Sequence, residues 1–412
     1  MQLSNVRVHT LSCPIEPTQT RSFYGGVRRL LKRDFVLAIV ETADGEVGYA
    51  PAGASSSAMR EYFEGASTDS FADLLGTDVT DAVTGIEIDE PADIAAAVRE
   101  LDLPKKIESE AISVFDIAYH DLWGKRVGEP VYTLLADREP SPDPLDMYAS
   151  AGMYMDPAGY AKQAAALQER GFSAYKFRPA GPPEDDVEAI RRIRDRVGAD
   201  MGIMVDAHTW WKLGERSYDF EQVASLLDDF ELSEPYWVEE PLSPADYEAY
   251  ERLGAGTDVS IAGGESEESP EGLRRLLRTG VKYLQGDARH HRGFTGCWDL
   301  VLACAEHDTA TFVPHNFGTH LGLVANAHLV VASPETALLE YPVFGCDVAG
   351  MYPFPLAEEI LVDDLDTEGG SLTVPDGPGL GVEVDESVVE KYPHIEGPWT
   401  EFVYGDAPDD AS

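Results

Sequence analysis

Three acidic residues in the middle of the chain share a local pattern that suits metal chemistry. Each follows a short apolar run, and the three are Asp206, Glu239 and Glu265. Such a run is typical of a strand buried on both faces, so each acid is expected where a strand leaves the core. One acid at a strand end is often a helix cap, but three that lie close together repel one another and imply a cation. Because these ligands are all oxygen, the pattern predicts Mg²⁺ rather than zinc.

A histidine with an acidic partner is predicted beside this trio. Asp287 ends one predicted strand and His315 ends the next, so the two side chains are expected within hydrogen-bonding reach. An Asp that orients a His makes a general base near neutral pH. His208 lies two residues after Asp206 and is expected to point the same way. Three other histidines, for which a surface or core position is the simpler interpretation, are His290, His291 and His320.

Two cations alternate on the predicted strand 174–178. Lys176 and Arg178 should face the same way and counter a bound carboxylate, although an outward pair of solvated cations is the alternative. Arg178 cannot act as a base, whereas Lys176 can do so if burial and neighbouring cations lower its pKa. Glu340 ends the last predicted strand of the series.

The spacing of these residues predicts the elements that hold them. From Asp146 onward apolar runs alternate with helical patterns, and the predicted strand ends recur 22 to 33 residues apart. An α/β barrel (a modified TIM barrel) uses about 31 residues per strand–helix unit and carries its chemistry at the carboxyl ends of the strands. Two of its helices are predicted over 156–171 and 184–197, each followed or closed by a glycine. No glycine-rich loop follows any strand, which disfavours a dinucleotide fold.

The N-terminal part is predicted to form an α+β capping domain. Its first 50 residues suggest strands, with a hairpin turn at Asp44-Gly45 and a polar loop over 16–29. Helical patterns follow, and the best-defined helix is predicted over 107–124. We expect a capping domain over 1–135, a barrel over 146–345, and a C-terminal segment over 346–412 that packs back on the capping domain.

The composition limits the classes of function. The chain has 75 acidic residues against 31 Lys and Arg, a net charge of −44, and the acids are spread along its whole length. We expect a cytoplasmic protein. A dispersed negative surface suits a very salty cytoplasm, although an acidic mesophilic enzyme is the alternative. We expect no nucleic-acid or membrane partner, because the sequence has neither a basic stripe nor a long apolar span. Four separated cysteines suggest reduced thiols: Cys13, Cys297, Cys304 and Cys346.

Taken together, these motifs resemble the mandelate racemase subgroup of the enolase superfamily. The acidic trio, the Asp287–His315 pair, Glu340 and the segment 115–125 before the barrel all carry the resemblance, which covers almost the whole chain. It implies that Asp206, Glu239 and Glu265 bind Mg²⁺, that the metal binds a substrate carboxylate, and that a base removes the adjacent proton.

Two departures from the family pattern narrow the reaction. The second-strand motif is usually Lys-x-Lys, but here it is Lys176-Phe177-Arg178, so racemisation by two bases lacks its second base. His208 is similar to the acid/base histidine of sugar-acid dehydratases in this superfamily. Both departures favour elimination of water by one base.

The predicted reaction is the Mg²⁺-dependent dehydration of a sugar acid, D-gluconate or D-xylonate, to a 2-keto-3-deoxy acid. His315 is predicted to remove the C2 proton, and His208, or His315 again, to protonate the departing C3 hydroxyl. Lys176 is expected to stabilise the developing charge, and the resemblance gives Glu340 a hydrogen bond to the substrate carboxylate if it is protonated. Alternatives are a racemase, epimerase or cycloisomerase on the same scaffold, and a catalytically silent barrel.

The predicted partners are a small sugar acid and further copies of the chain in a homo-oligomer. A monoacid is favoured because no second Arg or Lys cluster follows another barrel strand, with Arg289 and Arg292 as the exception.

Overall fold

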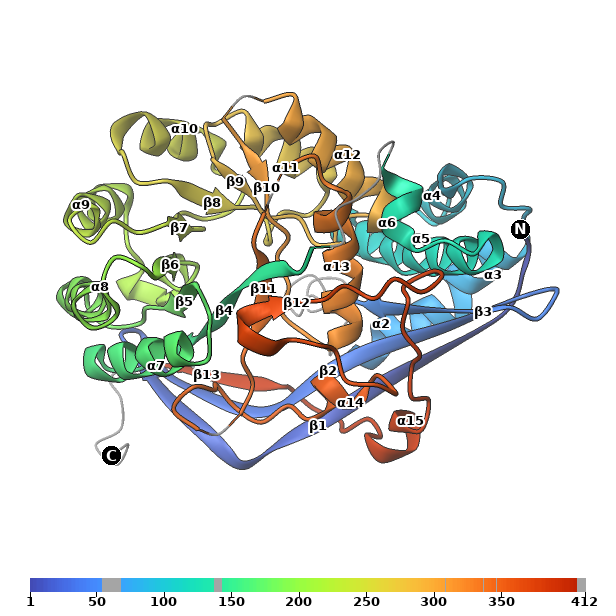
Figure 1. The fold of residues 1–412 in the computed structure, drawn as a ribbon, viewed down its shortest axis with the longest axis horizontal. Helices are drawn as coiled ribbons and strands as arrows, with labels where there is room; N and C mark the ends of the chain where they lie inside the picture. The colour runs from blue at the N-terminus through green and yellow to red at the C-terminus, as the bar shows by residue number, and fades with distance from the viewer. Residues whose placement is uncertain (54–67, 137–142, 308, 336, 346, 406–412) are drawn as a thin grey trace.

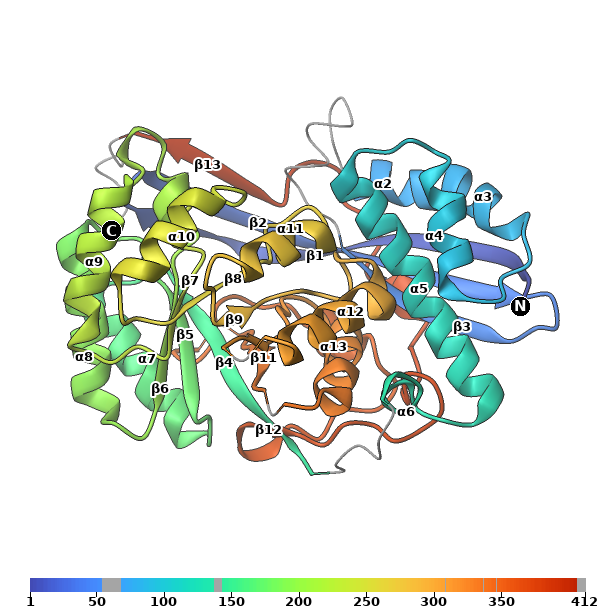
Figure 2. The ribbon, with the colours of Figure 1, turned by 90° about the horizontal axis from the view of Figure 1, so that it is seen from above.

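The computed structural model describes residues 1–53, 68–136, 143–307, 309–335, 337–345 and 347–405. A long antiparallel sheet and a curved parallel sheet dominate the molecule, and helices cover both (Figure 1). This is the predicted α/β barrel with an N-terminal α+β capping domain. The view from above shows the capping helices beside the barrel and the long strands running beneath both (Figure 2).

The antiparallel sheet joins the two ends of the chain. Its central strand, β2, pairs with β1 along one edge and with β13 and β3 along the other. The strands are β1 (Leu3–Phe23), β2 (Gly26–Thr42), β3 (Val47–Ala52) and β13 (Thr400–Tyr404). The predicted hairpin at Asp44-Gly45 therefore connects β2 to β3.

The predicted polar loop over 16–29 is wrong, because the chain continues there as paired strands. The β1–β2 ladder runs out to Phe23 opposite Gly26, so the turn is confined to Tyr24 and Gly25. Polar residues suit this ribbon because an antiparallel strand can turn one face to solvent. Gly26 has a φ of 150° and packs against the backbone of Val403, where a Cβ has no room.

The capping helices pack on this sheet. Among them α5 is largely buried and extends the predicted helix over 107–124 by a few residues at each end. It ends at Gly128, whose left-handed conformation (φ 77°) suits a glycine. The elements are α2 (Thr68–Leu74), η1 (Leu75–Val79), α3 (Thr80–Thr84), α4 (Pro91–Arg99), α5 (Lys105–Val127) and α6 (Val131–Leu135).

Eight parallel strands form the second sheet in the order β10-β9-β8-β7-β6-β5-β4-β11. They are β4 (Leu145–Met153), β5 (Ala174–Arg178), β6 (Gly202–Asp206), β7 (Trp237–Glu239), β8 (Ile261–Gly263), β9 (Tyr283–Leu284), β10 (Thr311–Phe312) and β11 (Leu339–Pro342). Each strand neighbours the next along the chain, as a barrel requires. In the described residues no ladder joins β10 to β11; β10 is short, and Pro314, which has no N–H, follows it.

Helices alternate with these strands, and α7 to α10 lie along the outer side of the sheet (Figure 1). They are α7 (Pro157–Glu169), α8 (Pro183–Val197), η2 (Trp210–Lys212), η3 (Gly214–Arg216), α9 (Phe220–Glu231), α10 (Tyr247–Gly256), α11 (Pro270–Leu277), α12 (Gly293–Ala305) and α13 (His320–Ala332). The predicted helices over 156–171 and 184–197 are confirmed as α7 and α8. Asp156 caps α7 by accepting hydrogen bonds from two backbone amides, the role expected for an acid before Pro157.

The C-terminal segment contacts both sheets. Its short strand β12 (Ser371–Leu372) pairs with β4 of the barrel, whereas β13 pairs with β2 of the capping sheet. The other elements are α14 (Leu356–Glu359), η4 (Glu368–Gly370) and α15 (Val388–Lys391). The domain limits proposed from the sequence remain a prediction.

Two expectations drawn from composition concern membranes and thiols. No helix in the described part of the chain is long and apolar enough to span a bilayer. Cys13, Cys297 and Cys304 are free and buried, and Cys346 lies outside the described residues.

Candidate active site

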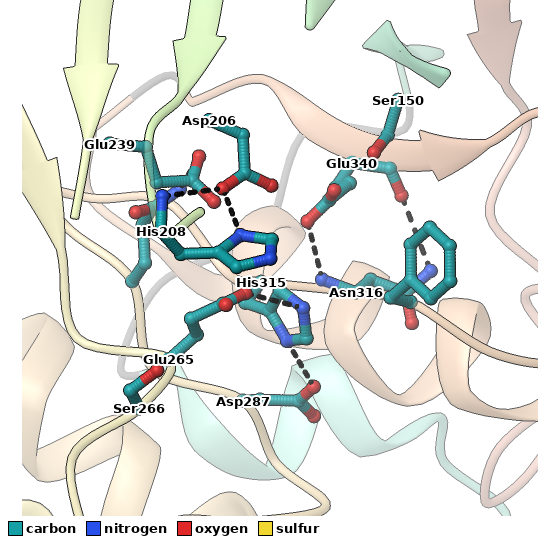
Figure 3. A network of polar contacts seen from close by, with 12 residues as sticks. Ser150, Asp206, His208, Glu239, Glu265, Ser266, Asp287, His315, Asn316 and Glu340 are labelled. Atoms are coloured by element: carbon teal, nitrogen blue, oxygen red, sulfur yellow. Dashed lines mark hydrogen bonds and ion pairs between the residues drawn. The ribbon is translucent and has the colours of Figure 1, made fainter. Parts of the chain in front are cut away.

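The acidic trio converges because its members follow three adjacent parallel strands. Asp206 ends β6 directly opposite Glu239 at the end of β7, and Glu239 pairs in turn with Ala262 on β8. Glu265 lies two residues beyond β8. Asp206 and Glu239 are fully buried, while Glu265 is partly exposed to the pocket, and Figure 3 shows all three beside His208 and His315.

Two members of the trio are paired with cations from neighbouring positions. The Asp206 carboxylate lies 3.0 Å from Arg178 Nε and 2.5 Å from His208 Nδ1. The Glu239 carboxylate lies 2.7 Å from Lys176 Nζ and accepts a hydrogen bond from Gln285 at 2.7 Å. Their negative charge is therefore partly compensated in this arrangement.

The third member meets the predicted dyad. Glu265 Oε2 lies 2.8 Å from His315 Nε2, and the other ring nitrogen, Nδ1, lies 3.0 Å from Asp287 Oδ2 (Figure 3). Arg289 and Asn326 donate hydrogen bonds to Asp287, so that carboxylate is held in place from two further sides. The predicted contact between Asp287 and His315 is thus present, although both residues lie three positions beyond their short strands.

Charges in this cluster shift its pKa values in both directions. Burial raises the pKa of Glu239 to about 8, since the neighbouring carboxylates add to burial while Lys176 opposes it. Burial also tends to raise the pKa values of Asp206 and Glu265. The adjacent cations and histidines outweigh burial, so both pKa values are lowered. Burial lowers the pKa of His315, yet Glu265 and Asp287 outweigh it and raise that pKa to about 10.

The trio fits a hard divalent cation by its chemistry. Three buried or half-buried carboxylates offer oxygen ligands only. Burial, and then repulsion from neighbouring carboxylates, raises the pKa of Glu239, and a metal that neutralises these charges is therefore favoured. In the part of the chain that the structure describes, no three acidic, His or Cys side chains already surround a common point. Each acid instead contacts a nitrogen group, which a bound cation would replace.

Lys176 and Arg178 point into the barrel and not to solvent. Lys176 Nζ lies 2.7 Å from Glu239 and 2.8 Å from Glu340, and both side chains are buried. Although burial lowers the pKa of Lys176, these carboxylates and Asp206 outweigh it and raise that pKa. The ammonium form is therefore favoured, which makes Lys176 a cation here and disfavours the alternative of a neutral base.

Glu340 occupies a different position from the one predicted. It is the second residue of β11, inside the strand, and it accepts a hydrogen bond from the Asn316 backbone at 2.9 Å (Figure 3). Burial raises the pKa of Glu340, but Lys176, His315 and Arg178 prevail and lower it. Because the ionised carboxylate only accepts hydrogen bonds, a donating Glu340 is disfavoured in this arrangement.

The cluster opens into a pocket of about 970 Å³ between the barrel mouth and the capping sheet. Asp206, His208, Glu265 and His315 line its inner end. The other wall includes Arg28, Arg33 and Phe35 of β2, together with Phe317, Tyr352, Phe354 and Trp399. A volume of this size is typical of sites for small molecules.

Arg289 and Arg292, which the sequence left open as partners for a diacid substrate, are both already paired with acids. Arg289 is buried and makes a two-pronged contact with Asp287. Arg292 pairs with Glu271 and with Glu108 of the capping helix α5. The sequence predicted no second Arg or Lys cluster at another barrel strand end, and Arg289 and Arg292 are both already paired. The prediction did not consider Arg28 and Arg33 of the capping sheet, which line the pocket.

His290 also contacts this network, although its sequence context favoured a plain core or surface role. Its ring lines the pocket, with Nδ1 3.0 Å from Glu110 of α5 and Nε2 3.9 Å from Asp287. Its position directly after Arg289 and three residues after Asp287 of the dyad is the signal in the sequence. His291 is buried against the Glu267 carbonyl, and His320 packs near Tyr341, outside the pocket lining.

Comparisons with known proteins agree with this architecture. Residues 159–388 match the family described as "Enolase C-terminal domain-like". The chain is 31% identical to D-gluconate dehydratase of Thermoproteus tenax over 74% of its own length, a match that spans 61% of that relative. It is 26% identical to D-galactarolactone cycloisomerase of Agrobacterium fabrum over 95% of this chain and 99% of the relative.

A solved structure shares the fold along nearly the whole chain. A member of the enolase superfamily from Polaromonas sp. JS666 superposes with a TM-score of 0.80 and 25% identity, covering 97% of this chain and 99% of the other. The family match alone covers more than half of the residues. On these grounds the chain is a member of the enolase superfamily.

Proposed function

We propose that this chain is a Mg²⁺-dependent dehydratase of small sugar acids. The observation that carries the proposal is the placement of two histidines at one carboxylate cluster: His315, paired with Asp287, and His208, paired with Asp206. Dehydration needs a group that removes a proton and a group that protonates the departing hydroxyl, and two histidines suit both tasks. Relatives named D-gluconate dehydratase and D-galactonate dehydratase support the same reaction class.

Asp206, Glu239 and Glu265 would hold the metal. When bound, Mg²⁺ would supply positive charge that binds the substrate carboxylate and stabilises the charge that develops on it. The ionised state of Asp206 and Glu265, favoured by their lowered pKa values, suits this ligand role.

His315 is the proposed base. Among the groups that raise its pKa, Glu265 contributes most, so a Glu265 that binds Mg²⁺ instead would leave the His315 ring able to accept a proton. His315 accepts the proton from C2 while Asp287, held by Arg289 and Asn326, fixes the orientation of the ring. The electron pair left at C2 forms the C2–C3 double bond as the C3 hydroxyl leaves, and a proton from His208 converts that hydroxyl to water. The enol product then ketonises to a 2-keto-3-deoxy acid, so the overall change is the loss of one water molecule.

Lys176 and Arg178 would stabilise negative charge at the inner end of the site. Both are buried cations beside the acidic cluster, so positive charge is already present where negative charge develops. Glu340 would hold Lys176 in place through their ion pair.

The substrates we propose to test first are D-gluconate and D-xylonate. By resemblance to the family, a single histidine at this position serves substrates with the R configuration at C2, which both acids carry. The cytoplasmic location and the homo-oligomer expected from the sequence remain proposals.

A cycloisomerase is the second candidate, because the relative of that name matches along almost its entire length. That reaction also begins with proton removal beside a carboxylate, so the barrel groups are compatible with both. A racemase is less favoured, since Arg178 stands where a second base is needed.

The test is a substrate screen of the purified chain with Mg²⁺ and molar KCl. Release of a 2-keto-3-deoxy acid from a sugar acid supports the dehydratase. Isomerisation of a lactone without such release supports the cycloisomerase, and exchange of the C2 proton without loss of water supports a racemase.

A further inference from the structure

Three arginines and two aromatic rings form a continuous series from the acidic cluster to the capping sheet, which we call the arginine ladder. Its members in order are Arg178, Phe317, Arg33, Trp399 and Arg28, and all five line the pocket. Successive guanidinium carbons and ring centroids lie 4.9, 5.3, 4.9 and 5.2 Å apart. Arg33 lies between two of these rings, and contact with an aromatic face leaves the N–H groups of a guanidinium available for hydrogen bonds.

The two outer arginines differ from Arg178 in their charge environment. Arg178 pairs with Asp206, whereas among the described residues neither Arg28 nor Arg33 has a carboxylate within ion-pair distance. Arg33 Nε is buried without a hydrogen-bond partner, and Arg28, only 7% exposed, donates from Nε to Thr400. Two uncompensated cations stand out in a chain with 75 acidic residues.

Acids close to the ladder do not neutralise these arginines. Asp34 lines the same pocket, but its carboxylate lies 3.0 Å from Lys32. The acids at 267, 268 and 271 belong to the segment after β8, and two cations, Lys106 of α5 and Arg275 of α11, line the pocket with them. The wall formed by Arg28 and Arg33 thus presents net positive charge to the pocket.

We propose that Arg28 and Arg33 bind an anionic group, a second carboxylate or a phosphate, at the end of the sugar acid opposite the reacting carboxylate. The inference rests on the proposed function and specifies its substrate class. Arg178 and Arg33 share one ring, and two cations within about 6 Å of one centroid lie within about 12 Å of each other. An extended six-carbon acid can bridge such a span, with its reacting end at the acidic cluster.

Guanidinium groups suit this role because they bind carboxylate or phosphate through two parallel hydrogen bonds. Such contacts persist in high salt, where the Debye length falls to about 3 Å at 1 M and long-range attraction is lost. A direct contact with a charged group typically changes affinity by about 10- to 100-fold.

The experiment compares three acids that share one reacting end: D-gluconate with a neutral far end, D-glucarate with a second carboxylate, and 6-phospho-D-gluconate with a phosphate. Keto-acid release is measured with Mg²⁺ at one fixed KCl concentration for the native chain and the Arg33→Gln and Arg28→Gln variants. Arg29→Gln is the matched control, because Arg29 lies between them on β2 but is half exposed and pairs with Glu401.

We expect the native chain to prefer one of the two anionic acids over D-gluconate by at least 10-fold in kcat/KM. D-Glucarate as the better substrate identifies a carboxylate as the group bound, and 6-phospho-D-gluconate identifies a phosphate. Arg33→Gln should reduce this preference by about 10- to 100-fold through KM, whereas Arg29→Gln should leave it unchanged. Equal or better use of D-gluconate by the native chain, or the same loss on all three acids in Arg33→Gln, overturns the proposal.

Binding separates this inference from the proposed function. The rise in Tm caused by each acid is measured with the native chain and Arg33→Gln, and with Arg33→Lys if the glutamine variant does not fold. If no acid is dehydrated, the proposed function fails. The anion site is then supported if D-glucarate or 6-phospho-D-gluconate raises the Tm of the native chain more than D-gluconate does, and if Arg33→Gln removes this difference. It is overturned if the native chain shows no such difference.

Discussion

The barrel mouth and the capping wall of the pocket handle charge in opposite ways. At the barrel mouth every acid of the trio has a nitrogen partner within 3.0 Å, and the cations there are paired as well. On the capping wall Arg28 and Arg33 face aromatic rings and, among the described residues, have no carboxylate partner. The compensated wall suits chemistry, since its charges are preorganised around reacting atoms, and the uncompensated wall suits recognition of an anion.

The same contrast appears in how the two walls are built. The barrel residues follow consecutive parallel strands, so one structural rule places all of them at one rim. The capping wall brings Arg33 of β2 against Trp399, a residue just before β13, through pairing between distant parts of the chain. We therefore expect substitutions at the barrel mouth to abolish turnover and substitutions on the capping wall to change substrate preference.

The largest effect is expected from Glu239→Gln on the barrel side. Loss of one carboxylate from the trio should weaken Mg²⁺ binding and reduce kcat/KM by at least about 10³-fold. Metal affinity measured by calorimetry and turnover measured with excess Mg²⁺ check this. Glu248→Gln, an exposed acid on α10, serves as the control, and full activity of Glu239→Gln or of native enzyme in excess chelator would contradict a metal site here.

A smaller loss should follow from Asp287→Asn, which keeps the shape but removes the charge that orients His315. We expect kcat to fall about 10²- to 10⁴-fold with little change in KM. The variant should also leave Arg289 without its buried partner and so lower Tm. A variant with unchanged kcat would show that His315 does not depend on this acid.

Acid sensitivity should reveal the junction where α13 of the barrel meets the α6 segment and the C-terminal segment. His328 of α13 is fully buried, where Nε2 donates to the Leu380 carbonyl and Nδ1 accepts from the Tyr132 backbone of the α6 segment. Burial lowers the pKa of His328 to about 4. The unfolded chain takes up this proton near pH 6.5, so the stabilising contribution of neutral His328 is lost as the pH falls from about 6.5 to about 4.

We expect this group to reduce the free energy of unfolding by about 2 to 3 kcal/mol across that range. Chemical denaturation at several pH values measures it, and His328→Gln should flatten the slope by nearly one proton. His307→Gln, an exposed histidine, is the matched control. Identical slopes for native chain and His328→Gln would show that His328 does not contribute to the acid sensitivity.

Salt should stabilise the whole molecule, and we expect its Tm to rise gradually with salt concentration. With a net charge of −44, repulsion extends over about 10 Å at 0.1 M salt but over only about 3 Å at 1 M. Tm should therefore rise as KCl is raised from dilute to molar concentration. A Tm that is independent of KCl would argue for an ordinary acidic protein.

The sequence alone was sufficient to predict the barrel and the acidic cluster because both depend on a regular repeat. Asp206, Glu239 and Glu265 follow apolar runs at barrel spacing, and the Asp287–His315 contact follows from adjacent strands. The segment 16–29 was predicted wrongly as a loop, because its polar residues mask a β1–β2 ribbon, of which only β2 also pairs with a distant strand, β13.

Long-range pairing also explains what the sequence left unseen in the site. Nothing local marks Arg33 as a neighbour of Phe317 and Trp399, because these contacts arise only once β2, the barrel and the C-terminal segment meet. The contact of His290 with Glu110 likewise joins the barrel to a capping helix. Charges and pKa values depend on such neighbours, so the ionised state favoured for Glu340 was not predictable from its position.

The central claim is that His315 removes the C2 proton of a sugar acid and that water is then lost. The most direct measurement follows C2 deuterium and keto-acid release in deuterated water, with Mg²⁺ and molar KCl, for native enzyme and His315→Asn. D-Gluconate, D-xylonate and D-glucarate form the substrate panel. The account predicts that native enzyme forms a 2-keto-3-deoxy acid and that His315→Asn gives neither product nor C2 exchange. Product from His315→Asn, or C2 exchange without loss of water by native enzyme, would contradict it.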